Sequence, residues 1–234
     1  MSLVAIALCC SSDIPLERSI YIHTYIYIYI HFVVVAQADI RGFGTPSETW
    51  QTGATVDFSS VFVAVAGRDT AAVINAKLSR GLHIVLSPGI YELEDSLRLT
   101  GAAHGQVLLG LGLATIVPTK GTAAVTVSAG AKGVRVAGLL LQAGTEHSAA
   151  LLQWGDPRSI GQAPANDADW GFIHDVFARV GGPRLPVGQQ ARADVMLSID
   201  RSGVIGDNMW LWRADHLQGG DLVRNGDNPC NNGE

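Results

Sequence analysis

The densest group of side chains suited to chemistry lies in residues 207–216, Asp-Asn-Met-Trp-Leu-Trp-Arg-Ala-Asp-His. Its carboxyl and imidazole groups can hold or move a proton, and its guanidinium can clamp a carboxylate through parallel N–H donors. Its two indole rings can stack on a sugar ring. The segment therefore supplies candidates for two roles: Asp215 and His216 for catalysis, and Arg213, Trp210 and Trp212 for substrate binding.

The two tryptophans also have a competing interpretation as core residues. Matching similar segments along the chain sets Leu211 level with Gln142 and Arg179, which we expect on the solvent face. Because side chains alternate along a strand, the tryptophans on either side of Leu211 would then point inward. The charged residues that follow lie beyond the apolar part of the strand, so an outward, functional placement stays open for them.

Two further catalytic candidates, Asp175 and Asp207, fall at the same place in two of these similar segments. If the segments are neighbours in the fold, their Cα atoms lie about 5 Å apart. Such a pair can share a proton and act as a general acid, or bind Ca²⁺ between the carboxylates. The alternative is that both are turn residues bonded to their own backbone. His174 is a weaker candidate, and beyond a calcium ion the sequence predicts no cofactor and no metal site.

Several classes of function lack support in the sequence. It contains no G-x-x-x-x-G-K-[ST] loop, no H-E-x-x-H and no G-x-S-x-G motif. The 16 basic residues, against 21 acidic ones, are spread without a Lys/Arg run, so we expect neither nucleic acid nor an anionic membrane as a partner. The 3 cysteines lie near the two ends of the chain and indicate no disulfide framework.

Short apolar segments separated by glycine must position the candidate residues. Glycine accounts for 27 of 234 residues and charged residues for only 16%, which favours short strands and tight turns. A capping residue at Asp69-Thr70, followed by apolar positions at helical spacing up to Gly81, predicts one short helix. Segments rich in Val, Ile and Leu predict strands at 82–86, 90–93, 96–99, 107–109, 123–127, 134–142, 173–180, 195–199 and 204–213.

Self-similarity predicts how these strands are arranged. Residues 133–141, 171–179 and 203–211 each begin with glycine and continue as an apolar strand. They recur roughly every 35 residues, the size of one supersecondary unit plus a variable loop. Parallel strands that return without crossover helices are best accommodated in a β-solenoid, in which each repeat buries its apolar row on the next.

Three segments near the start of this region resemble a known protein family. The helix sequence at 69–76, Ser-Pro-Gly-Ile-Tyr at 87–91 and Val-Leu-Leu-Gly-Leu-Gly at 107–112 look like the opening of right-handed parallel β-helix proteins of the pectin-lyase-like superfamily. Residues from about 50 to 228 resemble more closely an uncharacterised group of bacterial, fungal and algal β-helix proteins. Members of that group are often labelled adenylyl cyclases, an activity that no nucleotide-binding residues support here.

The resemblance implies an all-β fold, a right-handed parallel β-helix with a short N-terminal capping helix, over residues 41–228. In the resembling group the chain continues with further repeats, whereas residues 229–234 diverge. We therefore expect a truncated solenoid, whose open last repeat makes it less stable than a longer relative.

Residues 1–40 differ in composition from the rest of the chain, and we do not expect them to be part of the β-helix. Residues 20–31 are drawn from Ile, Tyr, His and Thr, as a translated dinucleotide repeat in an incorrect gene model would be. The alternative is a targeting segment, with an apolar stretch at 26–35 before Ala-Gln-Ala at 36–38, which predicts a secreted protein. We expect no membrane span, because the apolar stretch is short and interrupted by histidine and threonine.

The resemblance also implies a function. We expect the longer relatives to bind or cleave polysaccharide, as hydrolases or lyases, by acid/base chemistry on one sheet face. The alternative is a non-catalytic solenoid that binds glycans or serves as a surface or structural module. Both expectations rest on analogy of fold. We also expect the protein to be a monomer.

Overall fold

The computed structural model describes residues 55–159, 164, 166–181 and 189–213, together with the backbone of five short strands outside these ranges. The chain divides into two compact units, Met1–Phe62 and Val63–Glu234. In the first unit two antiparallel pairs are described, β1 (Ile20–Ile22) with β2 (Ile26–Ile28), and β3 (Phe32–Val34) with β4 (Thr55–Asp57). The gene-model and targeting interpretations of residues 1–40, and the tail at 229–234, lie outside the described residues.

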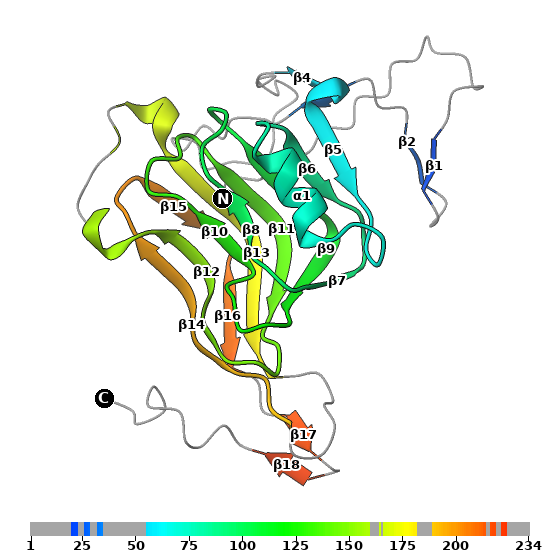
Figure 1. The fold of residues 1–234 in the computed structure, drawn as a ribbon, viewed down its shortest axis with the longest axis vertical. Helices are drawn as coiled ribbons and strands as arrows, with labels where there is room; N and C mark the ends of the chain where they lie inside the picture. The colour runs from blue at the N-terminus through cyan, green and yellow to red at the C-terminus, as the bar shows by residue number, and fades with distance from the viewer. Residues whose placement is uncertain are drawn as a thin grey trace. The chain divides into compact units, whose positions relative to one another are not determined.

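The second unit is mostly β, and two large sheets make up most of it (Figure 1). The smaller sheet has the order β14–β12–β10–β8. Its strands are β8 (Leu97–Leu99), β10 (Val125–Val127), β12 (Ser148–Gly155) and β14 (Ala193–Asp200). The chain alternates between this sheet and the larger one from β8 onward, so consecutive repeats add one strand to each sheet.

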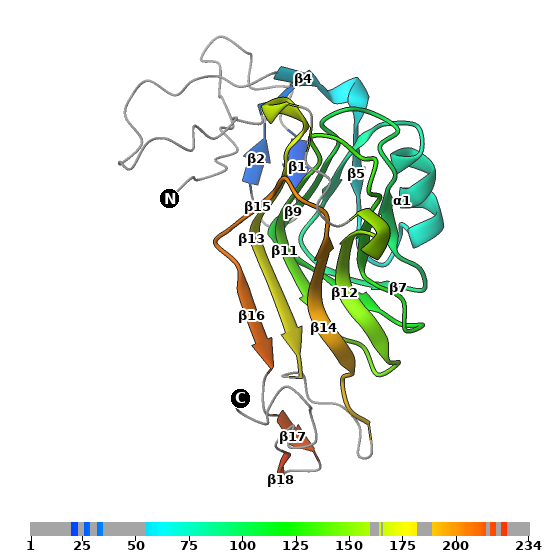
Figure 2. The same cartoon turned by 90° about the vertical axis from the view of Figure 1, so that its left-hand side faces the viewer.

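The larger sheet has the order β15–β13–β11–β9–β6–β5, and two further strands, β7 and β16, pair with β9 and β13. Its strands are β5 (Val61–Ala64), β6 (His83–Leu86), β7 (Ile90–Leu93), β9 (Val107–Pro118), β11 (Arg135–Gln142), β13 (Gly171–Val180), β15 (Val204–Asp207) and β16 (Trp210–Arg213). Neighbouring strands from β6 to β16 run parallel. The parallel pairing confirms the predicted mostly β fold with parallel strands. Figure 2 shows β13, β15 and β16 side by side.

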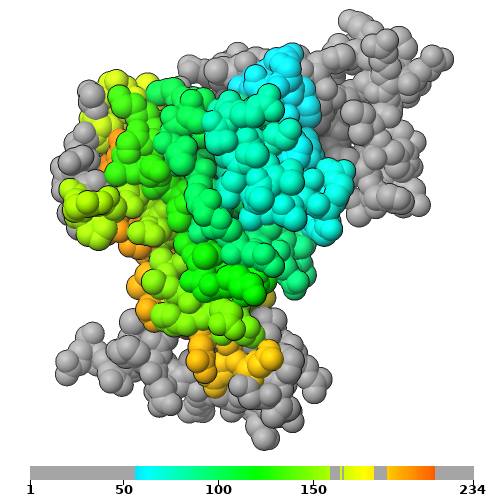
Figure 3. Space-filling model, in the orientation of Figure 1, coloured from blue at the N-terminus to red at the C-terminus, as the bar shows by residue number. Residues whose placement is uncertain are grey.

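The predicted helix is present as α1 (Ala71–Leu78). Thr70 is its N-cap and accepts a hydrogen bond from the backbone N–H of Val73 at 3.4 Å. After its last turn Gly81 adopts φ 84°, a conformation that favours glycine. The buried side of α1 contacts β6 and β8. In Figure 3 the cyan residues near the start of this unit lie against the green residues that follow in the chain.

The turn before α1 is held by Asp69. Its carboxylate accepts a hydrogen bond from the backbone N–H of Val65 at 2.8 Å and pairs with Arg68 Nη2 at 2.8 Å. The hydrogen bond from Arg68 holds the pKa of Asp69 below its ordinary value. The charged carboxylate therefore fixes the path of the chain from β5 into the helix.

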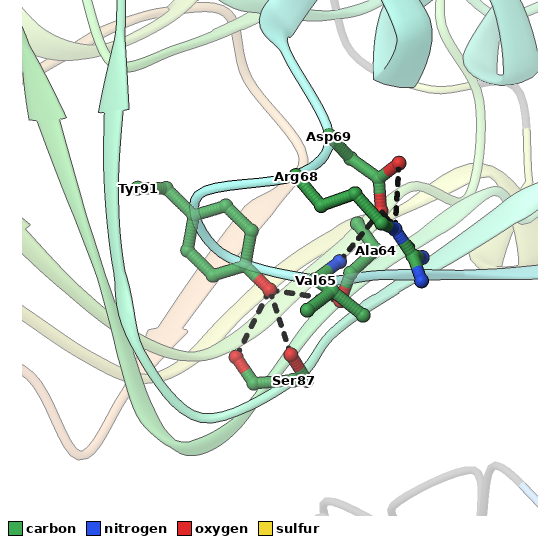
Figure 4. A network of polar contacts seen from close by, with 6 residues as sticks. All are labelled: Ala64, Val65, Arg68, Asp69, Ser87 and Tyr91. Carbon is green, nitrogen blue, oxygen red and sulfur yellow. Dashed lines mark hydrogen bonds and ion pairs between the residues drawn. The ribbon is translucent and has the colours of Figure 1, made fainter.

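Tyr91 of β7 joins its strand to the end of β5, just before this turn (Figure 4). Its hydroxyl donates to the Ala64 carbonyl oxygen at 2.8 Å and lies 3.0 Å from the carbonyl oxygen of Ser87. Tyr91→Phe is expected to lower the free energy of unfolding by about 1 kcal/mol, a modest loss because the Ala64 carbonyl still accepts from the Ser87 N–H. Urea unfolding measures this, and a variant as stable as the parent would contradict the proposed bond.

Two strands depart from the sequence prediction. The segment predicted as one strand at 204–213 is broken at Asn208 into β15 and β16. Strand β12 was not predicted, because its sequence, Ser-Ala-Ala-Leu-Leu-Gln-Trp-Gly, is poor in β-branched residues. Packing decides its conformation, since Leu151, Leu152 and Trp154 are all buried.

The core lies between the two sheets. Trp154 of β12, only 1% exposed, is the largest fully buried side chain. It packs over Gly171 of β13, where a Cβ atom would lie 2.3 Å from Trp154 Cζ2. Within the described part of the chain, no helix has the length and apolarity needed to cross a membrane.

Candidate functional site

A column of residues with left-handed backbone marks the bend in β11, in β13 and between β15 and β16 of the larger sheet. Gly138, Asp175 and Asn208 have φ values of 67°, 50° and 49°. They lie level with one another, because the residues just before them are Cα partners across β11, β13 and β15. Glycine, aspartate and asparagine are the residues that tolerate this conformation best. The column therefore fixes the register and brings two polar side chains together at its end.

A polar cluster surrounds this bend. The ring of His174, 6% exposed, lies between two carboxylates: Nε2 is 3.2 Å from Asp175 Oδ2, and Nδ1 is 3.1 Å from Asp207 Oδ2. Asn208 Nδ2 donates to the other oxygen of Asp175. Both carboxylates remain partly exposed beside the buried ring. The arrangement can store and relay a proton, and it also ties β13 to β15.

The predicted stack of Asp175 on Asp207 is wrong by one residue. Asp207 is the partner of His174, and it is Asn208 that lies level with Asp175. An imidazole ring thus contacts both carboxylates, whereas Ca²⁺ requires a shell of oxygen ligands. The geometric basis for a calcium ion between stacked carboxylates is lost. Among the described residues, no three His, Cys, Asp or Glu side chains are grouped to hold a metal ion.

An aromatic patch adjoins the polar cluster on the same strands. The rings of Trp210 and Trp212 stack with centroids 5.5 Å apart and an interplanar angle of 16°. Phe177 meets Trp210 edge-on at 6.4 Å. The two tryptophans are 60% and 44% exposed, so large apolar rings face solvent. We name Phe177, Trp210 and Trp212 the aromatic patch.

The interpretation of the tryptophans as inward-facing core residues is wrong. In the observed register Trp210 pairs with Phe177 and Trp212 with Arg179, while Leu211 pairs with the buried Ala178. The tryptophans therefore share the outward face of β13, and Leu211 has the inward direction. Gln142, expected on the solvent face, is buried and accepts a hydrogen bond from Arg179 Nε at 2.6 Å.

The remaining candidates do not join a common site in the described structure. Arg213 donates to the backbone carbonyl oxygens of Ala193, at 3.1 Å, and Asp194, so it holds the start of β14. Asp215 lies outside the described residues. Of His216 only the backbone is described, in β17 (His216–Gln218), which pairs antiparallel with β18 (Asp221–Val223). Their catalytic roles stay predictions.

Sequence reasoning missed the partners that complete the site. The sequence alone does not single out Asn208 or Phe177, and it makes His174 only a weak candidate. A signal was available, because only Gly, Asp and Asn occupy the column at 138, 175 and 208. Aligning the repeats on this column, rather than on their first glycines, gives the observed register.

The sequence of this chain is similar to one domain family and to one characterised enzyme. A sequence model of the LAM55 pectate lyase-like domain matches residues 61–232. An exo-beta-1,3-glucanase from Streptomyces sp. (strain SirexAA-E / ActE) is 34% identical over 192 aligned residues, and the alignment covers 80% of this chain and 29% of that protein.

Two solved structures are also similar. The structure of sacteLam55A from Streptomyces sp. SirexAA-E has a TM-score of 0.69 at 32% identity, and a variant of it in complex with glucose has a TM-score of 0.64 at 33% identity. Each comparison covers 80% of this chain and 32% of the solved chain. The chain therefore spans about a third of the length of these relatives.

Proposed function

We propose that this chain, which belongs to the LAM55 pectate lyase-like domain family, acts on β-1,3-glucan by holding the sugar chain at its aromatic patch. The substrate class is supported by the relative that is an exo-beta-1,3-glucanase. The observation that carries the proposal is the exposed stacked pair Trp210 and Trp212 beside a polar cluster on the same strands.

The chemistry of the patch suits a neutral polysaccharide. The C–H faces of a pyranose ring pack on aromatic rings, while its hydroxyls need hydrogen-bonding partners nearby. Phe177, Trp210 and Trp212 supply the apolar surface, and the side chains of Asp175 and Asn208 lie immediately beyond the patch along the same strands. No charged group of the substrate is required for such contacts.

The proposed fold is a right-handed parallel β-helix in which the two sheets are successive faces of each repeat. The alternation of the chain between the sheets and the parallel register support it. On this proposal the patch lies along an outer face of the solenoid, where an extended polymer can run across several strands. A secreted location, where such polymers occur, is part of the same proposal.

Hydrolysis by this chain is the second candidate, favoured by the activity named for its relative. Glycosidases of the usual two-carboxylate type place the reacting sugar carbon between the carboxyl groups. Here the His174 ring contacts both Asp175 and Asp207, so the two aspartates do not form such a pair. A hydrolytic role among these residues would fall to Asp175 alone, whose two oxygens lie against Asn208 and His174.

Loss of the patch is expected to weaken glucan binding. Trp210→Ala and Trp212→Ala should each raise the dissociation constant for a soluble β-1,3-glucan at least about tenfold, because each removes one ring of the stacked surface. Val73→Ala, which shortens another exposed apolar side chain, is the matched control. Isothermal titration of the full chain measures binding, and circular dichroism reports the fold. Unchanged binding in both tryptophan variants would refute the proposal.

The same titration separates binding from hydrolysis. Asp175→Asn and Asp207→Asn should retain glucan binding, because the aromatic surface is intact. If Asp175 takes part in hydrolysis, the release of reducing sugar falls in Asp175→Asn and persists in Asp207→Asn. If the chain only binds glucan, no variant and no parent protein releases sugar.

A further inference from the structure

A half-buried arginine at the start of β11 has no acidic partner among the described residues. Arg135 of β11 donates from Nη1 to the backbone carbonyl oxygen of Gly133 at 3.3 Å, and its guanidinium carbon lies 5.4 Å from the centre of the Phe172 ring. Among the described residues it makes no salt bridge. Burial lowers the pKa of Arg135, and no carboxylate offsets that effect. Buried charges are normally paired, so this one lacks the partner that would stabilise it.

A histidine lies two strands away on the same side. Val107 of β9 pairs with Arg135, and the backbone N–H of Val107 donates to His83 Nδ1 at 3.1 Å. Since Nδ1 accepts, the neutral ring carries its hydrogen on Nε2. Burial, followed by the charge of Arg135, lowers the pKa of His83, which keeps the ring neutral. Within the described structure no group accepts the Nε2 hydrogen of His83.

The two side chains therefore offer hydrogen-bond donors and no acceptor. Among the described residues the guanidinium donates only to the Gly133 carbonyl oxygen. Its fork geometry matches a pair of oxygen atoms on one anion. The Phe172 ring holds one face of the guanidinium, which limits the conformations it must lose when it binds.

We propose that Arg135 and His83 form a binding site for a small oxyanion, with the guanidinium as the charged clamp and His83 Nε2–H as a second donor. The anion is the carboxylate of a hexuronic acid or an inorganic oxyanion such as phosphate. This site is separate from the aromatic patch and does not depend on the proposed action on β-1,3-glucan.

Thermal unfolding of the full chain tests the site. Sodium phosphate and sodium glucuronate are added in separate series, with sodium chloride at equal ionic strength as the reference. An anion that binds the folded chain and not the unfolded chain raises the melting temperature. The rise should reach a few degrees as the anion concentration passes the dissociation constant. A rise with both anions indicates a general oxyanion site, and a rise with one alone identifies the source.

Variants assign any effect to the site. Arg135→Met keeps the apolar stem over Phe172 and removes the charge, so the dissociation constant should rise at least about tenfold. Arg98→Met, which removes an exposed arginine paired with Asp95, should respond like the parent. The proposal is overturned if neither anion exceeds chloride, or if Arg135→Met responds as the parent does.

A second measurement covers the case in which Arg135→Met does not fold. In the parent protein, phosphate or glucuronate should shift the NMR signals of the His83 ring. The ring of His147, which is exposed and pairs with Asp194 at 2.6 Å, serves as the internal reference. Equal shifts at both histidines, or none at His83, would rule out the site.

Discussion

Gly171→Ala is expected to destabilise the second unit by about 3 kcal/mol, the upper part of the range for overpacking a core. A Cβ atom at this position would lie 2.3 Å from Trp154 Cζ2 and 2.9 Å from Cη2. The indole cannot yield easily, because Trp154 is fully buried inside the repeat. Relief would require the β12 and β13 strands to separate, which would disturb both sheets.

Urea unfolding followed by tryptophan fluorescence measures this loss. Gly130→Ala is the matched control, because a Cβ atom there would meet no atom within 4 Å. That variant should stay within about 0.5 kcal/mol of the parent, as most surface substitutions do. Equal stability of the two variants would mean that Trp154 does not pack against β13 as described.

The positions of the local elements could be predicted from the sequence because local chemistry determines them. Thr70 and Gly81 mark the two ends of the helix segment, and the Val, Ile and Leu segments between glycines became strands. Strand β12 could not be predicted in this way, since its alanines and leucines have no local preference for a strand. Its conformation depends on burial between neighbouring repeats, which a single segment does not reveal.

The site depended on register, and there a shift of one residue changed the chemistry. Aligning repeats by their first glycines matched Asp175 with Asp207 and placed Trp210 and Trp212 inward. In the structure the repeat at 171–179 is displaced by one position relative to the repeats at 133–141 and 203–211. His174 therefore lies between the two aspartates, and the tryptophans face outward. Because side chains alternate along a strand, every residue after the shift changes face. The residues at the bend, and not the glycines that begin each repeat, carry the register.

Asp169 is expected to hold three consecutive repeats together through its charge. Its buried carboxylate lies 3.1 Å from His104 Nε2 and 3.2 Å from Lys132 Nζ, and it accepts a hydrogen bond from Asn166 at 3.2 Å. His104 precedes β9, Lys132 precedes β11 and Asp169 precedes β13. Asp169→Asn should therefore lower the melting temperature clearly at pH 6, because Lys132 and His104 lose the carboxylate that they share.

The pH dependence of that loss identifies the charge as its cause. Burial alone would raise the pKa of Asp169, but the hydrogen bonds from Lys132 and His104 outweigh it and hold the pKa below its ordinary value of 3.8. A carboxyl whose pKa is lower in the folded state stabilises the fold above the unfolded pKa. That contribution disappears as the pH falls through the lower, folded pKa.

The difference in melting temperature between the parent and Asp169→Asn should therefore be greatest above about pH 5 and shrink as the pH falls below 3.8. Asp167→Asn, in the same short turn but exposed, should match the parent at every pH. A difference that persists unchanged to pH 2 would assign the effect to packing. In that case the three repeats would be joined at this edge by their backbone hydrogen bonds, such as that from the Gly133 N–H to the Asp169 carbonyl oxygen.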